Sequence, residues 1–189
     1  MICCLQYLIM TAAVEAIERV NKTWILTQEA LSIIKREIHS QNKHTKIASR
    51  ILTSTIFEDH TLSQTEIDIT ECKQAAEDYA ILSMWAIFER HLIIRLECEC
   101  QKMLQIQPTD FNQRVFEKMT STIEYWRIDE AIDLIKPLVG SDLAGQAKSI
   151  KKYRDWVAHR NPRKPTPAKI DPQTAREILK IIAAAIDNQ

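Results

Sequence analysis

Glycine is almost missing from this sequence of 189 residues, which contains only Gly140 and Gly145. Tight hairpin turns need residues at positive φ, and glycine is the residue that adopts such angles most easily. A chain with two glycines therefore lacks the turn residues that an antiparallel sheet requires. The scarcity of glycine predicts an all-α fold.

Apolar residues recur at the three- and four-residue spacing of an amphipathic helix along most of the chain. Residues 40–66 are instead polar and rich in threonine, a pattern compatible with a short helix flanked by loops. Three prolines between residues 162 and 167 predict an extended segment. The predicted helices cover residues 11–39, in one piece or broken near Asn21; 71–104; a stretch from a cap at Thr109 or Asp110 through Met119; 126–136, ending near Pro137; 142–159; and a last helix that begins at the Asp171-Pro172 cap pair.

The length is that of one domain, or of one domain with an appendage, and is large enough to bury a hydrophobic core. We find no internal repeat and no long linker. The chain is expected to form N-terminal helices over residues 1–66 that pack on a helical bundle over residues 67–189, so that the two parts make one compact domain. Within that bundle, residues 71–104 are apolar on nearly every side of the projected helix, so this helix is buried on more than one face. Its second face meets either another subunit or the rest of a bundle in which it is the central helix.

Five cysteines occur without any CxxC pair, which excludes a disulfide framework and a typical zinc site. A reducing, cytoplasmic location fits this usage, and we expect no metal, no cofactor and no membrane span. The apolar stretch from Met1 to Met10 is too short to cross a bilayer. It is interpreted as a frayed helix start, or as extra residues ahead of a translation start at Met10.

Positive charge is concentrated near the C-terminus, in a protein whose formal net charge is zero. Between Lys148 and Lys169 there are eight lysines and arginines and one acid, Asp155, which gives a local charge of +7 and leaves −7 elsewhere. A basic patch beside a group that transfers protons suits a phosphodiester substrate. The alternative is an ordinary solvated helix end.

Inside this patch the chain reads Arg154-Asp155-Trp156-Val157-Ala158-His159. On the predicted helix Arg154 falls among the packing residues Leu143, Ala147, Ile150 and Val157, where a guanidinium must be paired or open into a polar cleft.

His159 projects about 140° away from Arg154 on a regular helix, so the two side chains do not lie side by side. Either the helix loosens before Pro162 or two chains supply the site. Asp155 is four residues before His159 and on its face, where it can fix the imidazole tautomer. Alternatively, His159 is an ordinary histidine at a helix C-terminus.

The segment Tyr153-Arg154-Asp155-Trp156-Val157-Ala158-His159 resembles the motif of HEPN domains, in which an arginine precedes a histidine by four to six intervening residues. The motif's place late in a helical chain, ahead of a final helix, also matches, and the segment from Trp85 to Leu92 resembles the family's central helix. The resemblance covers roughly residues 70–187. It departs from the family at Asn161, where toxins paired with nucleotidyltransferase antitoxins often have tyrosine.

The resemblance implies an up-and-down helical bundle that dimerises through its long central helix and its motif helix, so that two motifs face one another in a basic cleft. Many HEPN proteins are metal-independent endoribonucleases of toxin or antiviral defence systems, some with a cognate antitoxin or regulatory protein. Carried over, Arg154 would hold the scissile phosphate, His159 would be the general acid or base, and Asp155 would orient one of them. RNA contacts would come from Lys151, Lys152, Arg160, Asn161, Arg163 and Lys164.

The competing function is non-enzymatic: a HEPN-like dimeric adaptor, antitoxin partner or nucleotide sensor. A metal-dependent nuclease would need clustered carboxylates, which the sequence lacks. Glu89 and His91, on the central helix, are better explained as a satisfied buried pair or a subunit contact than as a second site. Of the four tryptophans, taken as core or interface anchors, only Trp156 stays open as a base-stacking surface.

Overall fold

In the computed structural model, the chain folds into helices, as the scarcity of glycine predicts. The structure describes residues 2–39, 54–55, 57, 60–106, 110–160 and 163–188. These ranges hold six α-helices, one short 3-10 helix and no strand. They are α1 (Ile2–His39), α3 (Leu62–Ile106), α4 (Asp110–Thr122), η1 (Ile123–Tyr125), α5 (Ile128–Val139), α6 (Ser141–His159) and α7 (Pro172–Asp187).

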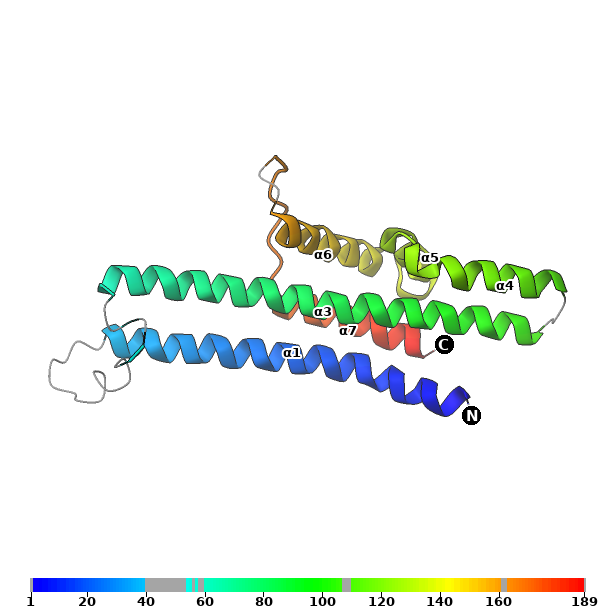
Figure 1. Ribbon diagram of the computed structural model, residues 1–189, viewed down its shortest axis with the longest axis horizontal. Helices are drawn as coiled ribbons and strands as arrows, with labels where there is room; N and C mark the ends of the chain where they lie inside the picture. Colours follow the sequence, from blue (N-terminus) through cyan, green and yellow to red (C-terminus); the bar gives the residue numbers. More distant parts are fainter. Residues whose placement is uncertain are drawn as a thin grey trace.

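Two long helices form the frame of the molecule. Helices α1 and α3 lie side by side and run in opposite directions, and α7 packs against both of them (Figure 1). Helix α6 packs against α3, α5 and α7, while α4 returns along the C-terminal part of α3 (Figure 1). The C-terminal half of the chain therefore lies along the middle and the C-terminal part of α3 (Figure 1).

This arrangement explains why α3 is apolar on nearly every side. Helices α1, α4, α6 and α7 of the same chain all contact it. Ile81, Met84, Trp85, Phe88 and Leu92 of α3 are completely buried in the main core. The central-helix alternative thus accounts for the pattern without a second subunit.

Several predicted helix ends are confirmed and others move. Helix α1 is continuous through the buried Asn21, so no break occurs there. Asp171 caps α7 by accepting a 3.0 Å hydrogen bond from the Thr174 amide, with Pro172 in the first turn, as predicted. The end of α5, predicted near Pro137, falls two residues later at Val139, because Pro137 lies in the last turn and forgoes only one helical hydrogen bond there. Gly140, at φ 85°, then ends that helix.

Part of the predicted structure falls outside the described residues. The short helix considered within residues 40–66 lies largely in ranges that the structure does not describe, and so does the alternative cap at Thr109. Asp110 is the first residue of α4, and Leu62 already begins α3. Among the described helices, none combines the length and the apolar character that a membrane crossing needs.

Candidate functional site

Helix α6 carries the Arg154 to His159 motif and is held by a row of buried side chains. Leu143, which the sequence places in this row, is only partly buried. The helix ends at Arg160, which adopts a left-handed conformation (φ 39°, ψ 44°) and whose amide donates a 2.6 Å hydrogen bond to the Trp156 carbonyl. The buried residues of α6 are Ala144, Ala147, Ile150, Tyr153 and Val157.

Arg154 points from α6 toward α3, where two acids receive its guanidinium. Nη2 forms a short ion pair with Oε2 of Glu89, and Nη1 lies 2.9 Å from Oδ1 of Asp155. The guanidinium also lies 5.8 Å from the ring centroid of Trp85, whose indole N–H donates a 3.0 Å hydrogen bond to the same Glu89 oxygen. With 26% of its side chain exposed, Arg154 is thus paired, as a partly desolvated charge must be.

His159 is the last residue of α6 and is exposed. Within the described part of the chain it has no hydrogen bond or ion pair, and it does not meet Arg154. Asp155 does not bind it either, because Asp155 oxygens accept Arg154 at 2.9 Å and Lys151 at 3.1 Å. Asp155 was expected to orient either Arg154 or His159, and in the structure it contacts Arg154.

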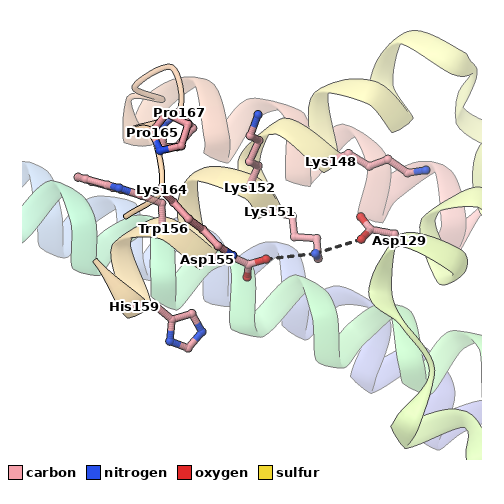
Figure 2. Close-up of a pocket in the computed structure, with 10 residues that line it drawn as sticks. All are labelled: Asp129, Lys148, Lys151, Lys152, Asp155, Trp156, His159, Lys164, Pro165 and Pro167. Atoms are coloured by element: carbon pink, nitrogen blue, oxygen red, sulfur yellow. Dashed lines mark ion pairs between the residues drawn. The ribbon is translucent and has the colours of Figure 1, made fainter. Parts of the chain in front are cut away.

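A pocket of about 720 Å³ runs along α6 (Figure 2). Figure 2 shows Asp129 and Lys148 at one end and Trp156, Lys164 and two prolines at the other. Arg154 does not line it. The lining residues are Asp129, Lys148, Lys151, Lys152, Asp155, Trp156, His159, Lys164, Pro165 and Pro167.

Much of the predicted basic patch is neutralised by acids from distant parts of the sequence. Lys151 lies between two carboxylates, at 3.0 Å from Asp129 and 3.1 Å from Asp155. Partial burial lowers the pKa of Lys151, but the hydrogen bonds that its ammonium donates to the two aspartates outweigh burial and raise it. The other pairs are Lys148 with Asp133, Arg160 with Asp78, and Lys169 with Glu77.

Two cations of the patch are left without an acidic partner among the described residues. They are Lys152 and Lys164, both exposed and both lining the pocket. Arg163 is exposed in the segment after α6, and Asn161 lies outside the described residues. Lys152 and Lys164 therefore line the same pocket as His159.

A buried acid that the sequence did not single out holds this end of α6. Asp78 of α3, with 3% of its side chain exposed, accepts hydrogen bonds from Tyr153 Oη at 2.9 Å and from Arg160 Nη2 at 2.5 Å. A third comes from Gln74 at 3.0 Å. Burial and the hydrogen bond to Asp78 raise the pKa of Tyr153 to about 12. The available signal was an aspartate on the side of α3 that carries the apolar residues Ile81 and Trp85.

Glu89 and His91 of α3 belong to separate pairs. Glu89 receives Arg154, whereas the buried His91 lies 3.0 Å from Asp187 of α7, a contact outside hydrogen-bond geometry. Burial raises the pKa of Asp187, against the opposing effect of His91. Glu89 and His91 therefore do not form the satisfied buried pair with one another that was considered, and neither residue lines the pocket.

In the described ranges, no three histidine, cysteine, aspartate or glutamate side chains come together in a way that could hold a metal ion. Comparisons with protein-family models, with curated proteins and with solved structures found no match to this chain. The HEPN resemblance therefore stays a hypothesis, and assignment of a function depends on the chemistry of the α6 pocket.

Proposed function

We propose that the protein is a metal-independent endoribonuclease of the HEPN type. The observation that carries the proposal is the state of His159, which is exposed, has no partner among the described residues, and lines a pocket beside Lys152 and Lys164. An imidazole titrates near neutral pH and can move a proton when no other group holds it. Lysines without acidic partners attract the phosphates of RNA.

The reaction would use the ribose 2′-hydroxyl as the nucleophile. One His159 removes the hydroxyl proton, the 2′-oxygen bonds to phosphorus, and the bond from phosphorus to the 5′-oxygen breaks. A protonated imidazole supplies the proton that the departing 5′-oxygen needs. The products are a 2′,3′-cyclic phosphate and a 5′-hydroxyl, and no metal takes part in any step.

Arg154 enters this mechanism through a homodimer. Within one chain it pairs with Glu89 on α3 and with Asp155, and it does not line the pocket that His159 lines. In the proposed dimer two α6 helices face one another, and the partner subunit's Arg154 reaches the phosphate that lies beside His159. The partly exposed guanidinium leaves an edge for that contact. A cytoplasmic toxin or antiviral defence protein, with or without a cognate antitoxin, would use such a site.

The second candidate is a non-catalytic dimeric adaptor, antitoxin partner or nucleotide sensor. The pairing of Arg154 with Glu89 and Asp155 favours it, because a structural ion pair fully explains why an arginine occupies that position. The neutralised cations Lys148, Lys151 and Lys169 point the same way.

The deciding experiment is an RNA-cleavage assay in EDTA with protein freed of any bound inhibitor. We expect cleavage with cyclic-phosphate ends, and His159→Ala should be slower by about 100-fold to 10,000-fold, as for a lost acid–base group. The matched control is His39→Ala, a change of an exposed histidine on α1, which should not alter the rate. Equal rates in wild type and His159→Ala, or an absolute need for a divalent metal, would overturn the mechanism. A monomeric mass in solution would overturn the shared site.

A further inference from the structure

The α6 pocket has the size and the composition of a site for one small polar molecule. Its volume of about 720 Å³ lies within the range of about 300–1,000 Å³ that is usual for ligand pockets. One wall is α6 and the other is the segment after it, which contributes Lys164, Pro165 and Pro167 (Figure 2). At the Asp129 end of the pocket the charges are paired, because Lys151 lies 3.0 Å from Asp129.

Trp156 supplies a flat aromatic surface in this pocket. Its indole is partly buried against the core, which restrains it, and it lines the pocket with the remainder of its surface. Arg160 lies over the ring at 5.8 Å and Tyr153 packs beside it at 6.1 Å between ring centroids. An aromatic ring held in place by its neighbours is a platform on which a nucleobase can stack.

The charge of the pocket suits a ligand with one or two negative charges. Four lysines and two aspartates line it, which gives +2 before His159 is counted. Asp129 and Asp155 bind Lys151, and Lys148 is paired with Asp133, so Lys152 and Lys164 are the two lining lysines without an acidic partner among the described residues. A flat surface and two cations in the same pocket are complementary to a base and its phosphate.

We propose that this pocket seats one unpaired nucleotide, with the base stacked on Trp156 against the pyrrolidine rings of Pro165 and Pro167, and the phosphate on Lys152 and Lys164. The ligand is a nucleotide unit, either a free mononucleotide or one residue of an RNA strand. Its being RNA rests on the proposed ribonuclease function. A base that stacks on Trp156 cannot remain paired in a duplex.

Binding can be measured without cleavage. The probe is a fluorescein-labelled oligoadenylate of about ten residues with 2′-O-methyl groups, which cannot attack the phosphate, and its reference is an abasic phosphate chain of equal length. Wild type should bind the oligoadenylate about 5-fold to 100-fold more tightly than the abasic chain, as expected for stacking of one base. Trp156→Leu should abolish this preference, and Trp156→Phe, which keeps a ring, should retain it.

The contribution of Lys152 and Lys164 can be measured separately, from the salt dependence of binding. Combined Lys152→Gln and Lys164→Gln should weaken binding of both probes and reduce the slope of affinity against salt by about two. Unlabelled adenosine monophosphate separates the two sources: displacement of the probe indicates a site that takes free nucleotides, and no displacement indicates one that takes a residue within a strand.

Trp126→Leu, a change of a partly buried tryptophan outside the pocket, is the matched control and should keep the wild-type preference. Equal binding of the two probes to wild type, or an unchanged preference in folded Trp156→Leu, overturns the nucleotide site. Preference for bases without cleavage of unmodified RNA in EDTA refutes the ribonuclease and leaves the site standing. Cleavage that depends on His159, without any preference for bases, refutes the nucleotide site and supports the ribonuclease.

Discussion

The Tyr153 hydroxyl donates a 2.9 Å hydrogen bond to Asp78, joining the motif helix α6 to the central helix α3 inside the protein. Asp78 is almost completely buried, and its second oxygen accepts the guanidinium of Arg160 at the end of α6. Together with Gln74, these donors satisfy a carboxylate that has little access to solvent. Asp78 of α3 therefore holds the end of α6 that carries His159.

Removing that acid should destabilise the fold. Asp78→Ala leaves the buried Tyr153 hydroxyl without its acceptor, and we expect a loss of about 2–3 kcal/mol in the free energy of unfolding, measured by urea denaturation. Tyr153→Phe in the Asp78→Ala background should cost little more, because the two groups act together. The control is Asp133→Ala, which breaks the exposed pair with Lys148 and should cost less than about 1 kcal/mol. Additive effects of the Asp78 and Tyr153 changes would contradict this coupling.

The Arg154 and Glu89 pair allows structural and catalytic roles to be separated. Arg154→Met leaves Glu89 partly buried without its cation and should lower both stability and RNA cleavage. Adding Glu89→Gln removes the uncompensated charge, so the double variant should regain stability, seen as a recovered melting temperature. Cleavage should stay low if Arg154 contacts the phosphate.

The opposite result is equally informative. Recovery of cleavage together with stability in the double variant would show that Arg154 acts only by holding α6 on α3. Glu89→Gln alone serves as the reference, since it keeps the arginine and changes only the acid.

Stability in acid should depend on Glu18 of α1. Hydrogen bonds from Arg176 and then Lys180 lower the pKa of Glu18 from 4.5 to about 2, against the opposing effect of burial. A carboxyl group whose pKa is lowered by folding stabilises the folded state above its unfolded pKa, and this contribution is lost as pH falls toward the folded value. The stability difference between wild type and Glu18→Gln should thus be constant above about pH 4.5 and shrink toward pH 2. Denaturation midpoints across this range measure it.

The control for this pH dependence is Glu15→Gln, a change of an exposed glutamate one turn earlier on α1. Its acid profile should follow that of wild type. A difference between wild type and Glu18→Gln that stays the same down to pH 2 would show that the pair with α7 does not form.

The helices could be predicted because the information for them is local. The Asp171 cap and Pro172 specify the start of α7 within four residues, and the structure has both features. The passage of α5 through Pro137 could not be predicted in this way, since packing of the buried Ile132 and Ile135 against the core outweighs one lost hydrogen bond. All-round apolarity of α3 could be seen in the sequence, but not which chain covers each side.

The site could be predicted only in part, because ion pairs join residues far apart in sequence. Helix geometry alone separates Arg154 from His159, and the structure agrees. Helix geometry could not show that Glu89 would pair with Arg154, or that Asp129 would neutralise Lys151 in the basic patch. Counting charges along a segment overstates the free charge whenever the fold brings acids to it.

Arg160 combines two demands that oppose each other. Its backbone has the left-handed conformation that glycine adopts with least strain, at φ 39°. Its side chain, however, reaches Asp78 and lies over Trp156. A glycine would relax the backbone but remove both contacts. Arg160 therefore accepts backbone strain, and in return its side chain links the end of α6 to the buried Asp78 and to Trp156 in the pocket.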